Sequence, residues 1–336
     1  MIKLKVKYTN RFAFSQSGKQ LTKSVKPTLG NILYWSEKEM SGVKDSIKHF
    51  DLIHTEIISK MTNKKYFYQD NGGFLLQIIN GEIGVAMQNY WRELLMRTHF
   101  ASITSIMRNE RWLKGLNSSI MTNNYILFTS SLRGFLESVT DSYYSLLSKP
   151  TAIALNFKNI KLAINGKLSR PLWSKEFEES LIHFQHASKS NKSGIKNNKP
   201  LSASNYIKIY DEYGDNDTKK LYSALCEVVH PANNSISCFT KLITETKDFE
   251  YAITCVGLDA ELIDKLIDDN STTISNLLKI SISAPVLCLK VLNLLKSDFV
   301  ESYYLESCFI NSQIESGDGW QRIVEMVEKS NKLEHI

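Results

Sequence analysis

The sequence predicts a mainly α-helical protein, built from one or more helical bundles with a small β-containing segment at its N-terminus. The 336 residues are 43% hydrophobic and 10% aromatic, which is enough to form a sizeable packed core. Only six prolines and fifteen glycines interrupt the chain, and this scarcity favours long helices over many short strands. Beyond about residue 40, apolar residues recur at steps of three and four, as on one face of a helix.

The first 40 residues differ from the rest, because Ile2, Leu4, Val6 and Tyr8 alternate with polar residues and predict an extended or β segment. This charged start also lacks the apolar centre of a signal peptide. No run of eighteen apolar residues occurs anywhere in the chain, so no membrane span is expected. These features favour a cytoplasmic protein.

Helical periodicity divides the remaining chain into a helical domain over 41–190, a mobile loop over 191–205 and a C-terminal helical domain over 206–336. The loop belongs to a stretch, HASKSNKSGIKNNKPLSASN, that is dominated by Lys, Ser and Asn and can bury almost nothing apolar. The segments with a helical period, taken in order, are about 42–61, 84–107, 124–147, 175–186, 217–230, 260–305 and 319–329.

Charge and cysteine content set limits on function. The net charge of +6, from 41 basic and 35 acidic residues, permits a modest attraction to nucleic acid and equally suits a lysine-rich soluble surface. The five cysteines are never closer than about twelve positions, a spacing that offers neither a zinc knuckle nor a disulfide framework. They are expected to be reduced thiols in the core.

The stretch YSALCEVVHPANN places Glu227 and His230 at the end of an amphipathic helix, on the side opposite its apolar stripe. Pro231 ends the helix, so His230 lies near unpaired carbonyls at the negative end of the helix dipole. Both that dipole and Glu227 favour an imidazolium, which could act as an acid or bind phosphate. The alternative is a histidine that caps the helix and has no other role.

Arg133 and Glu137 lie four residues apart on one face of the segment 124–147. An intrahelical ion pair explains them. They could instead face the helix that carries Glu227 and His230, so that two acids, one guanidinium and one imidazole share a cleft.

A second arginine and histidine, Arg92 and His99, are seven residues apart and lie on one face of the segment 84–107. Their spacing fits Arg-x(4–6)-His, the signature of HEPN domains, which are helical modules of many prokaryotic toxins and defence proteins. Val85, Met96 and Ile103 share this face, so a partly buried structural pair fits the pattern as well.

The combination of RGFLE at 133–137 with LYSALCEVVHP at 221–231 resembles a group of all-helical bacterial proteins related to HEPN domains. The resemblance covers residues 120–235 and implies a polar centre made by Arg133, Glu137 and His230, with Glu227 nearby. It implies a metal-independent ribonuclease, in which the arginine steadies phosphate charge and the histidine handles a proton. It also implies a homodimer. Unlike the HEPN signature, His230 has no arginine four to six residues before it, so its dyad would be assembled between helices.

A metal site is the third chemistry to consider, because Glu227 and His230 have the spacing found in di-iron helical bundles. Such bundles need the motif twice, and the other histidine pair, His183 and His186, borders the lysine-rich loop. No Gly-rich phosphate loop or nucleophile elbow occurs either. No metal and no cofactor are therefore expected.

Two functions remain. The first is a HEPN-like ribonuclease of a bacterial toxin or phage-defence system, with RNA as its partner. The second is a non-catalytic helical adaptor, whose apolar C-terminal helix with Trp320 docks on a protein partner.

Overall fold

The computed structural model describes residues 42–61, 64–68, 71–181, 184, 200–213, 217–231, 233–245, 249–254 and 257–332. The predicted β segment over residues 1–40 lies outside these ranges, as do most of the predicted loop and the pair His183 and His186. The one part of that loop that is described, from residue 200, differs from the prediction, because a helix begins at Ala203.

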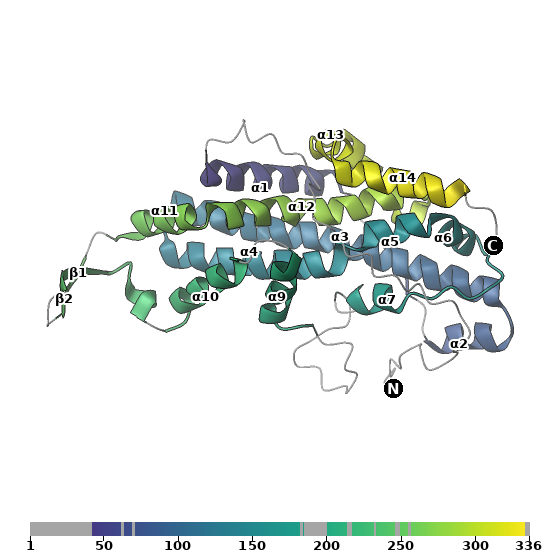
Figure 1. The fold of residues 1–336 in the computed structure, drawn as a ribbon, viewed down its shortest axis with the longest axis horizontal. Coiled ribbons are helices and arrows are strands. Elements are labelled where there is room, and N and C mark those ends of the chain that lie inside the picture. Colours follow the sequence, from purple (N-terminus) through teal and green to yellow (C-terminus); the bar gives the residue numbers. More distant parts are fainter. Residues whose placement is uncertain are drawn as a thin grey trace.

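The prediction of a mainly helical fold is confirmed (Figure 1). The helices are α1 (Val43–Lys60), α2 (Asn71–Ile79), α3 (Ile83–Met121), α4 (Tyr125–Leu146), α5 (Lys149–Leu155), α6 (Phe157–Ile164), α7 (Lys175–Leu181), α9 (Ala203–Tyr213), α10 (Thr218–Val229), α11 (Asp259–Asp269), α12 (Ser271–Asn293), α13 (Ile310–Glu315) and α14 (Asp318–Lys332). Short 3₁₀ turns, η4 (Asn233–Ile236), η5 (Asp298–Val300) and η6 (Tyr303–Ser307), join some of them.

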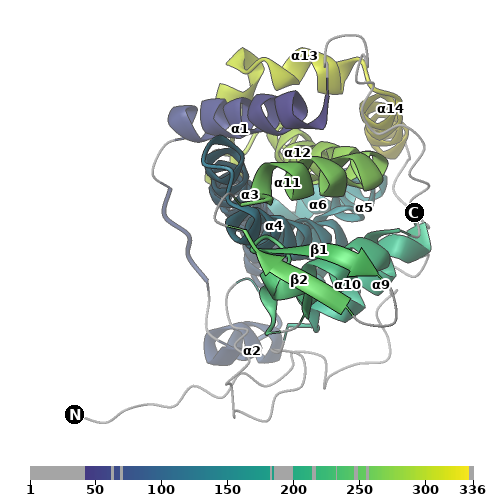
Figure 2. The same ribbon diagram turned by 90° about the vertical axis from the view of Figure 1, so that its left-hand side faces the viewer.

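Three long helices form the centre of the molecule. Helix α3 has 39 residues and is therefore about 58 Å long, so it runs along most of the elongated body. Helices α4 and α12 pack against it, and α1 packs against both α3 and α12. Figure 2 shows the resulting layers end on, with α1 and α13 on one side and α9 and α10 on the other.

Packing is continuous across the boundary predicted near residue 200. One cluster of buried apolar side chains includes residues from the N-terminal part, such as Phe50 and Phe128, and residues from the C-terminal part, such as Leu278 and Val327. The reason is the position of α12, which comes late in the chain but packs against α1, α3, α4 and α5.

Helix α12 also explains the most apolar stretch of the sequence. Among the described residues it is the one helix long and apolar enough to cross a membrane. However, 78% of its most apolar window is buried inside the protein, as expected for the core helix of a soluble protein.

A β-hairpin lies in the predicted C-terminal helical domain, between the segments 217–230 and 260–305 that have a helical period. Strands β1 (Thr240–Glu245) and β2 (Phe249–Ile253) pair antiparallel, with Thr240 opposite Ile253 and an irregularity between Leu242 and Thr244. The segment is rich in Thr, Ile, Phe and Tyr, which favour strands. In β1 the apolar residues Leu242 and Ile243 are adjacent and do not alternate with polar residues, so the sequence shows no strand period here.

The cysteines agree with the prediction where they are described. Cys238, Cys288 and Cys308 are buried, Cys226 is half-buried, and all four are free thiols. Burial raises the pKa of the Cys288 thiol to about 12, so this side chain stays protonated and unreactive. Cys255 lies outside the described residues.

The C-terminal helix differs from what a docking helix requires. Trp320 on α14 is only 8% exposed, and the Lys290 ammonium lies 4.8 Å from the centre of its ring. Helix α14 packs against α5 and α6 of the same chain. Its apolar stripe is therefore covered within the molecule and is not available to a partner.

Candidate functional site

Arg133 and His230 meet, although they lie 97 residues apart in the chain. Arg133 Nη1 is 3.3 Å from His230 Nε2, and Arg133 Nε is 3.2 Å from Glu137 Oε1. The Tyr222 hydroxyl donates to the same Glu137 oxygen over 3.1 Å, and the Arg133 guanidinium lies 5.5 Å from the centre of the Tyr222 ring. We call Arg133, Glu137, Tyr222 and His230 the Arg133 cluster.

Local sequence explains this meeting. Arg133 and Glu137 are neighbours on α4 because residues four apart share a helix face. Helix α10 ends at Val229, and His230 is extended, with φ −92° and ψ 152°, as expected of a residue that precedes a proline. Its backbone N–H still donates to Cys226 O over 3.0 Å. Position 230 thus turns away from the helix, and its exposed ring reaches α4.

The contact fixes which proton His230 carries. A guanidinium has donors and no acceptor, so His230 Nε2 must accept from Arg133. In this contact the ring accepts at Nε2 and carries its proton on Nδ1. His230 is exposed, so its Nε2 can reach a substrate proton once Arg133 turns away from it.

The other members of the Arg133 cluster hold the arginine charged and in place. Burial alone would lower the pKa of Arg133, but the Tyr222 hydroxyl and the Glu137 carboxylate outweigh it, and the pKa is raised. Burial, followed by the Glu137 charge, raises the pKa of Tyr222, so this phenol stays protonated and can donate to Glu137. Glu137 thus orients the Arg133 guanidinium through Nε, and Nη1 points toward His230.

Glu227 is not part of the Arg133 cluster. Its Oε2 accepts from Asn234 Nδ2 over 2.6 Å, and the side chain is exposed. It therefore holds η4 against the end of α10. Among the described residues, no group of three His, Cys, Asp or Glu side chains is placed to hold a metal ion.

The second predicted pair, Arg92 and His99, does not come together as a dyad. Arg92 is exposed and lies over the ring of Phe299, 5.0 Å from its centre. His99 is 2% exposed, and both ring nitrogens are occupied, by Tyr66 Oη at 2.8 Å and Ser302 Oγ at 2.7 Å. Their spacing places Arg92 and His99 on one helix face, but the spacing could not show that Tyr66 and Ser302 enclose His99.

Burial, with the charge of Lys64 as a smaller cause, lowers the pKa of His99 to about 4. The ring is therefore neutral at physiological pH and has no accessible lone pair. Its hydrogen bond with Ser302 has the geometry of a nucleophile and its base, but Ser302 is only 1% exposed and no substrate can reach it. His99 is a structural residue.

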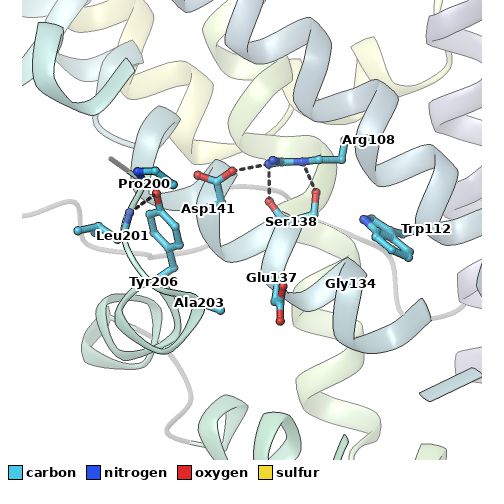
Figure 3. Close-up of a pocket in the computed structure, with 10 residues that line it drawn as sticks. All are labelled: Arg108, Trp112, Gly134, Glu137, Ser138, Asp141, Pro200, Leu201, Ala203 and Tyr206. Atoms are coloured by element: carbon cyan, nitrogen blue, oxygen red, sulfur yellow. Dashed lines mark hydrogen bonds and ion pairs between the residues drawn. The ribbon is translucent and has the colours of Figure 1, made fainter. Parts of the chain in front are cut away.

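A cavity of about 370 Å³, whose lining residues are drawn in Figure 3, shares Glu137 with the Arg133 cluster. Helices α3, α4 and α9 and the residues before α9 provide its lining, which is Arg108, Trp112, Gly134, Glu137, Ser138, Asp141, Pro200, Leu201, Ala203 and Tyr206. Sequence reasoning missed this cavity, because its polar groups come from separate segments. The one signal was Gly134, an unexplained glycine inside a helix.

Arg108 anchors the wall of the cavity. Its Nε donates to Ser138 Oγ over 2.8 Å, and its Nη2 donates to Asp141 Oδ2 over 2.6 Å. Ser138 in turn donates to buried Asn109 Oδ1 over 2.5 Å. Burial and the Asp141 charge raise the pKa of Tyr206, whose hydroxyl accepts from the Leu201 backbone over 3.1 Å. Ser138, Asp141 and the Leu201 backbone thus hold Arg108 and Tyr206 in the wall of the cavity.

The Trp112 indole leaves no room for a side chain at position 134, so this position needs glycine. A Cβ placed on Gly134 would lie 2.5 Å from Cζ2 of the indole, closer than any real contact. We expect Gly134→Ala to lower the free energy of unfolding by about 1–2 kcal/mol, because overpacking outweighs the gain of about 1 kcal/mol in helix propensity. Urea unfolding measures this change.

The matched control is the same substitution in a Trp112→Ala background. There the clash is absent, so Gly134→Ala should stabilise the protein by up to about 1 kcal/mol. If Gly134→Ala changes the free energy of unfolding equally in both backgrounds, contact with Trp112 is not the reason that position 134 needs glycine.

Comparison with known proteins found no relative of this chain. No protein-family model matches the chain, and neither a curated protein nor a solved structure matches it at a significant level.

Proposed function

We propose that this protein cleaves RNA without a metal ion, with Arg133 and His230 as its catalytic pair. The proposal is supported above all by the distance of 3.3 Å between Arg133 Nη1 and His230 Nε2, at a place where His230 is exposed. A cation next to a proton acceptor is the combination that transfer of a phosphoryl group needs.

In the proposed step, His230 Nε2 takes the proton of a ribose 2′-hydroxyl as the 2′ oxygen attacks the adjacent phosphorus. The bond from phosphorus to the 5′ oxygen breaks, and that oxygen takes a proton from water. The hydroxide left behind takes the proton from His230, which restores the catalyst. The products are a 2′,3′-cyclic phosphate and a 5′-hydroxyl end. Arg133 turns from the imidazole to the phosphate and balances the negative charge that develops there.

The net charge of +6 supports attraction to an RNA backbone. The resemblance to HEPN proteins adds a role in bacterial toxicity or phage defence in the cytoplasm, and a homodimer.

The test is cleavage of RNA in the presence of a chelator, with DNA of the same sequence as a second substrate. RNA is expected to be cut and DNA is not, because DNA has no 2′-hydroxyl. Arg133→Ala is expected to lower the rate about 10²–10³-fold, the usual cost of removing a group that stabilises transition-state charge. Arg133→Lys should recover part of the rate, since it keeps the charge but loses the planar fork.

Arg170→Ala is the matched control, because it removes the same charge from an exposed position outside the Arg133 cluster. Its rate should stay close to that of the unchanged protein. Equal losses in Arg133→Ala and Arg170→Ala would mean that net charge alone matters, and the catalytic proposal would fail.

A second candidate is a non-catalytic interaction subunit, and the β-hairpin supports it. Within the described part of the chain, the sheet has two strands only, so each has an unpaired edge. Phe239, Ile243 and Ile253, in and beside the hairpin, are 48%, 53% and 84% exposed. Absence of RNA cleavage together with a stable protein complex that needs these residues would favour this function.

A further inference from the structure

We propose that the cavity beside the Arg133 cluster binds a guanine base, and that RNA is therefore cleaved next to a guanosine. This inference rests on the proposed function, because it assigns the base whose phosphate reaches Arg133 and His230. The cavity of about 370 Å³ is at the lower end of the roughly 300–1,000 Å³ typical of small-molecule pockets, a size that suits one base.

Glu137 provides the first recognition group. Its Oε1 already accepts from Arg133 and Tyr222, whereas Oε2 makes no hydrogen bond with the described residues. The side chain is 37% exposed and lines the cavity. A carboxylate oxygen accepts hydrogen bonds only, so it favours a base that presents adjacent N–H donors. Guanine does so at N1 and N2, whereas uracil offers one N–H between two carbonyls.

Arg108 provides the second recognition group. Its Nε and Nη2 are bonded within the wall, but Nη1 makes no hydrogen bond with the described residues. A guanidinium N–H favours the O6 and N7 acceptors of guanine, the commonest specific contact of arginine with a base. Adenine presents an amino group in place of O6, and cytosine has no second ring. A cavity with a carboxylate and a guanidinium thus matches guanine best of the four bases.

Trp112 provides a surface for stacking. It lines the cavity, is 37% exposed and packs closely on Gly134. In the view of Figure 3, Glu137 lies between Trp112 and Tyr206. Bases commonly bind to proteins by stacking on an exposed aromatic ring of this kind. The indole is held in place by α4, so a base enters a surface that already exists.

Glu137 links the cavity to the catalytic pair. Its Oε1 is 3.2 Å from Arg133 Nε, so a base held by Oε2 has its ribose and phosphate beside the Arg133 guanidinium. Base recognition and phosphate contact are therefore two ends of one site.

The test uses binding as well as cleavage. Titration of the full chain with guanosine 3′-monophosphate should quench tryptophan fluorescence, and Trp112→Phe should remove most of this signal. Calorimetry with the adenosine, cytidine and uridine 3′-monophosphates should show affinities at least about 10-fold weaker, as expected from the loss of one base-edge pair. Glu137→Gln should weaken binding of the guanosine nucleotide by a similar factor.

A second variant separates the base site from the catalytic pair. Ala203→Phe is expected to fill the cavity from α9, outside the Arg133 cluster. It should abolish the preference for guanosine in an RNA of mixed sequence and lower cleavage after guanosine to the rate after the other nucleotides.

The outcomes are distinguishable. Equal cleavage after all four nucleotides, unchanged in Ala203→Phe, would overturn the guanine site and leave the ribonuclease proposal standing. Selective binding of the guanosine nucleotide without any RNA cleavage would overturn the proposed function and support the base site. No binding of any nucleotide by calorimetry would overturn the guanine inference outright.

Discussion

His230→Ala is expected to lower RNA cleavage about 10²–10⁴-fold, the usual contribution of a positioned general base. The change removes the only acceptor that Arg133 Nη1 has among the described residues, and the guanidinium keeps its bond with Glu137. Because His230 is exposed and follows the last helical residue of α10, folding should be little affected. Single-turnover cleavage of RNA, with circular dichroism as a check on the helices, measures both.

Glu227→Gln is the matched control for His230→Ala. Glu227 lies one turn earlier on α10, is also exposed and bonds Asn234 instead of the Arg133 cluster. Glutamine keeps an acceptor for Asn234, so cleavage should not change. If His230→Ala cleaves RNA as fast as the unchanged protein, His230 is not the base.

Acidification from pH 7 to pH 4 is expected to destabilise the protein by roughly 6 kcal/mol, through two buried histidines. His54 is fully buried, its Nδ1 is 2.7 Å from Phe50 O, and burial lowers its pKa to about 4. His99 has a pKa of about 4 for the same reason. The ordinary pKa of each is 6.5.

Between pH 6.5 and pH 4 the unfolded chain binds a proton at each histidine, and the folded protein does not. Stability is therefore complete above pH 6.5 and falls as the pH drops toward 4, by about 3 kcal/mol for each residue. Asp51 acts in the opposite direction, because burial raises its pKa. The expected loss is a large part of the roughly 5–15 kcal/mol that stabilises a typical domain.

Urea unfolding at several pH values tests this prediction when the protein is compared with His99→Phe. The variant loses the hydrogen bonds to Tyr66 and Ser302 and is less stable at pH 7, and of the two buried histidines only His54 remains to titrate in this window. Its loss of stability between pH 6.5 and pH 4 should be about half that of the unchanged protein. Equal losses would show that His99 is already protonated in the folded state or contacts water.

Periodicity predicted the amphipathic helices well, because burial of one face is a local property. Helices α1, α4, α10 and α14 begin and end within a few residues of the predicted segments. Helix α3 was predicted to end near residue 107 and extends to Met121. The prediction stopped there because Asn109 and Glu110 are polar and yet buried, and Asn109 donates to Ser281 O on α12. A polar residue that finds its partner on a distant helix breaks the apolar period.

For the candidate site too, the features that depend on neighbouring residues were predictable and those that depend on packing between helices were not. Sequence could place Arg133 beside Glu137 and place His230 at the end of its helix, since both depend on neighbours. It could not show that α4 and α10 pack together, nor that Tyr66 and Ser302 enclose His99. Arg108 and Trp112 were missed because their cavity exists only after α9 packs on α4.

The late position of α12 in the chain has a consequence for biosynthesis. A ribosome releases α1, α3 and α4 first, but their shared apolar surface is covered by a helix that begins at Ser271. Folding of the nascent chain therefore cannot finish until most of it has been translated. We expect the emerging N-terminal helices to be clients of chaperones during this interval, and expression of the first 200 residues alone to yield an aggregating fragment.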